Sequence, residues 1–195
     1  MMKKQLFQRL IALFLCSVLN VSMATETIPV NLQSQTISSD FWWAYLASYD
    51  QGPGSIVVNL GLKKQLPLSK YPILIITGVT YVSQRVDGLP ESSALDNLNK
   101  LSSKLIDAIE KVTPSIHAGT FKHNRECLHY VYVKDGSIIE EALKAFYLKE
   151  CPGCKTYTNI KDDPDWTAYK DFLFPNQATL DFYHDDLAKL QYKFN

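Results

Sequence analysis

Cys151 and Cys154, in the pattern Cys-Pro-Gly-Cys, are the two side chains of this 195-residue chain whose spacing is best suited to chemistry. A redox-active pair of this spacing needs its first cysteine at the start of a helix, where the helix dipole lowers the thiol pKa. Here the pair follows a predicted helix over 137–149 and precedes a predicted short strand over 155–160. The carbonyl end of a helix disfavours a thiolate, so we interpret the pair as a structural disulfide. Redox catalysis and reduced or metal-bound thiols are the alternatives.

A zinc site would need more ligands, and a predicted hairpin over 116–133 could supply them. If Phe121 faces Cys127 across this hairpin, then His117, Cys127 and His129 share one face of the sheet, because side chains alternate along a strand. Together with the cysteine pair they could form a tetrahedral nitrogen and sulfur site. No second Cys-x-x-Cys is present, so we predict no bound metal. We interpret Cys127 as an unpaired, buried thiol.

Four aromatic residues, from two segments that are far apart in the sequence, could line a ligand groove. They are Trp42, Trp43, Trp166 and Tyr169. Packing in the core is the alternative, because large aromatic side chains dominate core burial. Arg85 and Asp87 lie in a predicted loop between a strand and a helix, which is a usual place for binding residues. For these two residues, the alternative is an ordinary solvated turn.

No complete catalytic motif is present in the sequence. It has no G-x-S-x-G, no H-E-x-x-H and no glycine-rich phosphate loop. The 20 basic and 20 acidic residues leave no basic excess, which disfavours a nucleic-acid partner. We therefore assign no catalytic residue and no cofactor. We predict a non-enzymatic module that binds a protein or a small ligand. A thiol-disulfide oxidoreductase using the cysteine pair, or a hydrolase with an unrecognised site, is the alternative.

The first 24 residues have the pattern of a secretory signal peptide. Basic residues at 3, 4 and 9 precede an apolar run over 10–19, and Ser22-Met23-Ala24 supplies small residues before a cleavage point. The run is shorter than the ~20 residues that a spanning helix needs. We expect cleavage after Ala24 and export to the periplasm or the cell exterior, without stable membrane insertion afterwards. An uncleaved N-terminal anchor is the alternative.

Hydropathy patterning predicts the elements that position these residues. We expect a polar leader over 25–40, one α+β domain over 41–175, and a C-terminal helix over 176–195 packed on it. Predicted strands cover residues 55–62, 73–82, 116–121, 127–133 and 155–160. Predicted helices over 91–112 and 137–149 should pack on one face of the sheet. The side chains expected to make this contact are Leu98, Leu105, Ile109, Ile138 and Phe146.

Four motifs occur in a characteristic order along the mature chain. They are Trp43-x-Tyr45, the strand over 54–60, the turn over 87–90 (Asp-Gly-Leu-Pro), and the segment over 163–175. In this order they resemble the family catalogued as domain of unknown function 695, over about residues 41–175. The last segment also resembles the regulator of ribonuclease activity B, which implies a ferredoxin-like α+β fold with two helices on one face of an antiparallel or mixed sheet. The ribonuclease role is not implied, because this chain is predicted to be exported and lacks the strong acidity of that regulator.

Overall fold

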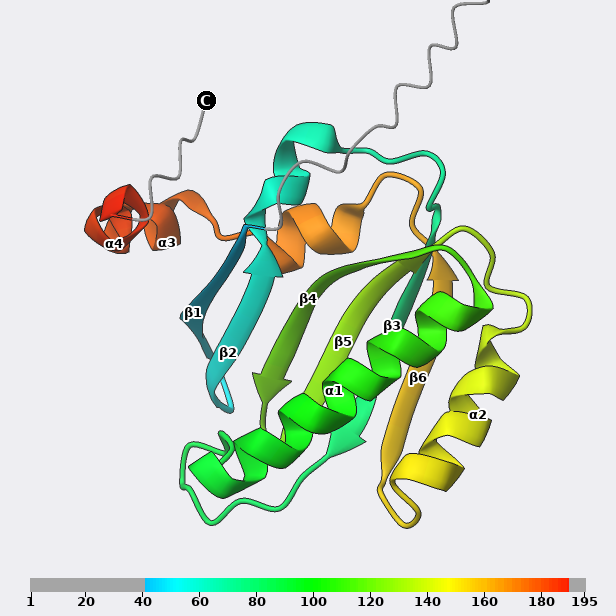
Figure 1. Cartoon of the computed structure of the whole chain (residues 1–195). Coiled ribbons are helices and arrows are strands. Elements are labelled where there is room, and N and C mark those ends of the chain that lie inside the picture. The colour runs from blue at the N-terminus through cyan, green and yellow to red at the C-terminus, as the bar shows by residue number, and fades with distance from the viewer. Residues whose placement is uncertain (1–40, 190–195) are drawn as a thin grey trace, which may run out of the picture. The chain divides into compact units, whose positions relative to one another are not determined.

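Six strands form one antiparallel sheet in the computed structural model, which describes residues 41–189 (Figure 1). In chain order, the elements are β1 (Trp42–Tyr49), β2 (Gly52–Asn59), the 3-10 helix η1 (Leu60–Gln65), β3 (Ile73–Thr80), α1 (Ser92–Val112), β4 (Ser115–His123), β5 (Glu126–Val133), α2 (Ile139–Glu150), β6 (Thr156–Asp162), the π-helical turn η2 (Ala168–Leu173), α3 (Gln177–Phe182) and α4 (His184–Lys189). None of the helices described here is long and apolar enough to cross a membrane.

The strand order β1-β2-β4-β5-β3-β6 contains a ferredoxin-like unit. This unit runs β3-α1-β4-β5-α2-β6, and the β1–β2 hairpin extends its sheet beside β4. Every neighbouring pair of strands is antiparallel. The predicted fold class, an α+β fold with two helices on one face of an antiparallel or mixed sheet, is confirmed (Figure 1).

Helix α1 packs on the sheet through the stripe predicted from its sequence. Leu98, Leu105 and Ile109 are buried, and they contact Val131 and Val133 of β5 in one apolar cluster. The three leucine and isoleucine residues recur at spacings that place them on one side of a helix. The prediction for this helix is therefore confirmed.

Helix α2 packs through a different set of residues from the one predicted. Ile138, expected in the core, precedes the helix and is 61% exposed, whereas Ile139, Leu143 and Tyr147 are buried against the sheet. Phe146 is half-buried beside the same cluster. Successive helical residues point about 100° apart, so placing the start of the helix one or two residues too early selects the wrong isoleucine.

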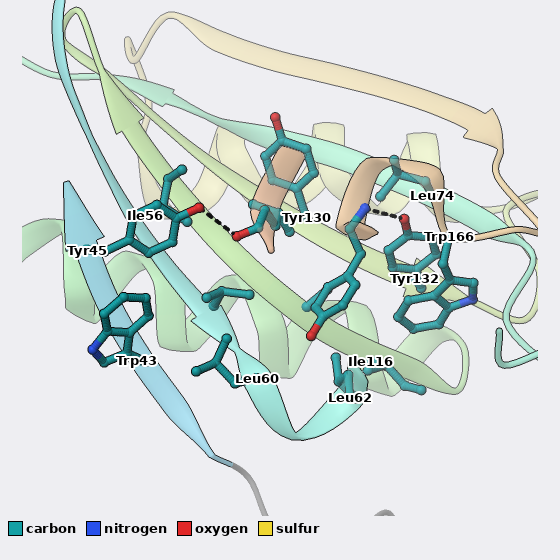
Figure 2. Close-up of a cluster of buried hydrophobic side chains, with 14 of the residues drawn as sticks. Trp43, Tyr45, Ile56, Leu60, Leu62, Leu74, Ile116, Tyr130, Tyr132 and Trp166 are labelled. Carbon is teal, nitrogen blue, oxygen red and sulfur yellow. Dashed lines mark hydrogen bonds between the residues drawn. The ribbon is translucent and has the colours of Figure 1, made fainter. Parts of the chain in front are cut away.

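A second apolar cluster covers the opposite face of the sheet (Figure 2). Leu74, Tyr130 and Tyr132 point to this face from β3 and β5, in alternation with the residues that face α1 and α2. The segment after β6 covers them with Trp166, Tyr169 and Leu173, and η1 adds Leu60 and Leu62. Residues 177–189 form two short helices, α3 and α4, rather than one continuous helix, and they contribute the buried Leu187. The remainder of the predicted C-terminal helix lies outside the described residues.

Strand β1 was missed by the sequence analysis, which interpreted its residues only as an aromatic cluster. Trp43 and Tyr45 are buried in the second cluster, while Trp42 and Leu46 point to the other side of the sheet and are exposed. Large apolar residues on both sides hide the alternation of a strand. The predicted leader over 25–40 lies outside the described residues.

Candidate functional site

The Cys151 and Cys154 side chains meet in a tight turn between α2 and β6. Their Cα atoms are 5.5 Å apart and their sulfur atoms are in contact. The Cys154 amide donates a hydrogen bond to the Cys151 carbonyl oxygen at 3.0 Å. Gly153 has a φ of +92°, a backbone conformation that glycine adopts without strain. The two cysteines therefore form the expected close pair, at a Cα separation that suits a disulfide.

Cys151 lies at the carbonyl end of α2. Its amide donates a hydrogen bond to the Tyr147 carbonyl oxygen at 3.0 Å and so closes the last helical turn. The partial negative charge of this helix end disfavours a thiolate on Cys151. This placement differs from the helix start that lowers the thiol pKa in redox-active pairs.

A cleft of about 690 Å³ lies beside the cysteine pair. Its wall residues come from the end of β3 and the loop after it, from the first half of α1, and from the turn between α2 and β6. They are Val79, Thr80, Tyr81, Val82, Ala94, Asn97, Leu98, Leu101, Glu150, Cys151, Gly153, Cys154 and Lys155. In Figure 1, α1 and α2 diverge toward this end of the sheet, and the end of β3 lies between them.

The cleft combines apolar walls with a few polar groups. Six of the lining side chains are aliphatic or aromatic, and Val82 is 80% exposed although it is a β-branched apolar residue. Glu150 is already paired, because Lys104 on α1 donates to its carboxylate at 2.6 Å. This hydrogen bond is the main cause of a lowered pKa for Glu150. Asn97 and Lys155 are exposed polar residues that also line the cleft.

A row of hydrogen-bonded polar side chains lies between α1 and the sheet, with Thr120 and His129 buried and Ser102 and His117 partly exposed. The Thr120 Oγ1 atom is 3.2 Å from His117 Nε2 and 3.1 Å from His129 Nδ1. His129 Nε2 is 3.0 Å from the Ser102 hydroxyl, which donates to the Leu98 carbonyl at 2.7 Å. A register shift of β4 between residues 117 and 119 places His117 and Thr120 on the same face, although they are three residues apart.

The Cys127 thiol lies beside His129, and both side chains are uncharged at neutral pH. Cys127 Sγ lies 3.8 Å from His129 Nε2. Burial raises the pKa of the Cys127 thiol to about 11. Burial, with smaller contributions from His117 and Lys122, lowers the pKa of His129 to about 3. A nucleophilic pair requires a thiolate and an imidazolium, so these shifts oppose nucleophilic catalysis by Cys127.

The predicted hairpin pairing needs one correction. Cys127 faces Lys122, and Phe121 faces Leu128, so the turn is offset by one residue from the expected symmetry. His117 and His129 nevertheless share a face, with ring centroids 5.5 Å apart. Across residues 41–189, no group of three or more cysteine, histidine or acidic side chains is arranged to hold a metal ion. Zinc coordination by these residues and the cysteine pair therefore has no support from the geometry.

Arg85 and Asp87 interact with each other in the loop between β3 and α1. Arg85 Nε donates to Asp87 Oδ1 at 2.9 Å, and the Leu89 amide donates to the same oxygen at 3.1 Å. These two hydrogen bonds lower the pKa of Asp87 to about 2, and the one from Arg85 has the larger effect. Both side chains remain partly exposed. They stabilise the loop, and they are not among the residues that line the cleft.

The four aromatic candidates do not come together in one groove. Trp166 and Tyr169 are fully buried, and the Tyr169 hydroxyl donates to the Asn59 carbonyl at 2.8 Å. Trp43 is also buried, whereas Trp42 is 37% exposed and contacts the ring of His117. The burial of Trp43, Trp166 and Tyr169 supports the core-packing alternative for these three residues.

The cleft residues outside the cysteine pair carry no sequence motif that marks them as a site. Leu98 was assigned only to the packing stripe of α1, and Tyr81 and Val82 were placed in a strand that in fact ends at Thr80. The cleft depends on how far α1 and α2 diverge, which periodicity does not report.

A family model described as "Family of unknown function (DUF695)" matches residues 40–174. The matched range includes all six strands, both main helices and the cleft, and it ends before α3. No curated protein and no solved structure matches the chain.

Proposed function

We propose that this chain, which belongs to the DUF695 family of unknown function, is an exported, non-enzymatic binding module. Its cleft beside Cys151 and Cys154 takes a ligand with an apolar body. The observation that carries this proposal is the cleft itself. Its volume of about 690 Å³ lies within the ~300–1,000 Å³ range of small-molecule sites. Such sites are lined mainly by apolar side chains with a few polar groups, as this cleft is.

The polar groups of the cleft favour an amphipathic ligand over a purely apolar one. Lys155 and Asn97 offer a cation and an amide, while the carboxylate of Glu150 is occupied by Lys104. A ligand with an apolar body and an anionic or hydrogen-bonding end would contact both kinds of group. We assign the cysteine pair the role of holding the turn that forms one side of the cleft.

Thiol-disulfide exchange is the second candidate function, because the cysteine pair is partly exposed and borders the cleft. The position of Cys151 at the carbonyl end of α2 opposes this function. A structural pair and a catalytic pair differ in one measurable property. Structural disulfides have reduction potentials below about −300 mV, and catalytic ones are more easily reduced.

The binding proposal predicts that filling the cleft abolishes binding. Titration with the apolar anionic dye 1-anilinonaphthalene-8-sulfonate should give saturable fluorescence with the wild-type protein. Ala94→Trp places an indole in the cleft wall and should weaken dye binding at least about tenfold, which corresponds to ~1.4 kcal/mol. Ala145→Trp makes the same change at an exposed α2 position outside the cleft, and should leave binding unchanged.

Two further outcomes of this titration separate the candidate functions. The double variant Cys151→Ser with Cys154→Ser should still bind the dye, but more weakly, because the turn on one side of the cleft is no longer held. It should lose only modest stability, because the closed loop is very short. Equal dye binding by Ala94→Trp and the wild-type protein would refute the cleft as the binding site. A reduction potential well above that of structural disulfides would support the thiol-disulfide alternative instead.

Export is supported by the basic, apolar and small-residue pattern of residues 1–24. The expected result is a mature chain that begins at Thr25. Intact-mass measurement of protein recovered from outside the cytoplasm of the expressing cell checks this start. Recovery of a chain that retains Met1, or that carries a lipid on Cys16, would contradict it.

A further inference from the structure

Strand β6 has a free outer edge in the described part of the chain, because β3 is its only neighbour there. The Lys155 carbonyl oxygen accepts a hydrogen bond from the Thr80 amide, and the Asp163 amide donates one to the Pro72 carbonyl oxygen. The backbone groups of Lys155 and Asp163 therefore point toward β3 and the residue before it. Backbone groups alternate in direction along an antiparallel strand. The amides and carbonyls of the even-numbered residues therefore point away from the sheet. These residues are Thr156, Thr158, Ile160 and Asp162.

A groove of about 480 Å³ runs beside this edge. Its walls are β6 residues 156–160 and the α2 side chains Glu140 and Lys144. Leu148 follows Lys144 by four residues, which places it on the same side of α2. Leu148 is 77% exposed, and Tyr157 on the strand is 43% exposed. The free backbone edge is thus bordered by two exposed apolar side chains, a feature of protein interfaces.

The residues of β6 are complementary to a second copy of the same strand. In an antiparallel pairing centred on Asn159, all seven residues of β6 overlap, with Thr156 opposite Asp162 and Tyr157 opposite Lys161. A centre one residue earlier would place Lys155 opposite Lys161, which is unfavourable for like charges. A centre one residue later would leave two residues of the strand unpaired. Charge and overlap therefore select the Asn159 register.

We propose that the β6 edge is a self-association surface, at which two copies of this chain pair their β6 strands antiparallel about a two-fold axis at Asn159. The four outward-facing residues of each copy then exchange hydrogen bonds with the other copy, and the two sheets become continuous. Each subunit contributes the same surface to this interface, as two-fold symmetry requires. Leu148 of each copy lies beside the junction. This association is independent of ligand binding in the cleft.

Cross-linking at the axis tests both the association and its register. In the proposed pairing, Asn159 faces its own copy at a position without inter-strand hydrogen bonds, where Cβ atoms are ~4.5–5.5 Å apart and a disulfide can form. Asn159→Cys in the mature full-length chain should therefore form a covalent dimer on mild oxidation. Lys161→Cys is the matched control, because its two copies would lie four residues apart along the strands, about 13 Å. Non-reducing electrophoresis and peptide mass spectrometry report the linked residue.

Sedimentation of the uncross-linked protein supplies the second readout. The wild-type chain should sediment as a dimer, and Asn159→Asp, which places two carboxylates at the axis, should raise the dissociation constant at least about tenfold. Monomeric wild-type protein at the cross-linking concentration would overturn the proposal. Equal cross-linking of Asn159→Cys and Lys161→Cys would also overturn it, because random collisions would then explain the covalent dimer.

Discussion

Replacing Trp166 by alanine is expected to lower the free energy of unfolding by about 3–5 kcal/mol, the cost typical of removing a buried tryptophan. The indole is fully buried and stacks on Tyr132, with ring centroids 3.7 Å apart (Figure 2). Its N–H group has no hydrogen-bond partner in the described part of the chain. The loss therefore comes from packing and from the cavity that alanine leaves.

The backbone at Trp166 is strained, and the contacts of this segment compensate for the strain. Trp166 has a φ of +59°, in the left-handed region that costs a bulky residue on the order of 1–3 kcal/mol. The Asp163 carboxylate holds the segment in place, because it accepts from the Tyr132 hydroxyl at 2.6 Å and from the Thr167 amide at 2.8 Å. The Ala168 amide donates to the same carboxylate at 3.0 Å. Stacking on Tyr132 offsets the strain of the turn.

Two variants serve as controls for this prediction. Trp166→Phe keeps a ring against Tyr132 and loses no hydrogen bond, so it should cost clearly less than Trp166→Ala. Trp42→Ala removes a tryptophan that is 37% exposed and should also cost less. Urea unfolding monitored by circular dichroism measures all three variants. A loss below about 1 kcal/mol for Trp166→Ala would contradict the packing role. If Trp166→Phe folds but no longer binds the dye, Trp166 is part of the ligand site.

Periodicity was sufficient to predict the elements whose apolar residues lie on one side only. Leu98, Leu105 and Ile109 recur at helical spacing, and α1 packs through them. The same reasoning failed for β1, where Trp42 and Trp43 point to opposite sides of the sheet. It also selected Ile138 in place of Ile139, because the helix starts later than its polar flanking residues suggested.

The candidate site was only partly predictable for a different reason. The sequence shows that Cys151 and Cys154 are near each other and near a helix end, and both features are local. The walls of the cleft come from three separate segments of the chain, and Val82 and Ala94 belong to two of them. The role of Trp166 was ambiguous because an aromatic residue suits a core and a ligand groove equally well. Burial decides between these two, and burial is a property of the folded chain.

Stability is expected to fall steeply below about pH 6.5 because of His129, the second residue with a large expected effect. Burial lowers its pKa to about 3 in the folded protein, whereas an unfolded histidine has a pKa near ~6.5. Between these two values the unfolded chain binds the additional proton. The free energy of unfolding contributed by this group is thus present above about pH 6.5 and is lost as the pH falls toward 3.

The hydrogen bonds of His129 explain why a second proton is excluded. The Ser102 hydroxyl donates to the Leu98 carbonyl, so its oxygen is left to accept from His129 Nε2–H. His129 Nδ1 then accepts from the Thr120 hydroxyl at 3.1 Å. A proton added at Nδ1 would make both ring nitrogens donors, and the Thr120 hydroxyl would have to turn and accept where it now donates. The neutral imidazole is therefore the form that satisfies every partner in the chain.

The expected loss attributable to His129 between pH 7 and pH 4.5 is about 2–3 kcal/mol, which follows from the separation of the two pKa values. Urea unfolding at several pH values measures it as the difference in slope between the wild-type protein and His129→Gln, which cannot titrate. His184→Gln is the matched control for the substitution itself, because His184 is an exposed histidine of α4. Identical slopes for the wild type and His129→Gln would show that His129 takes up its proton within the folded protein, which would contradict a histidine sealed in its neutral form between α1 and the sheet.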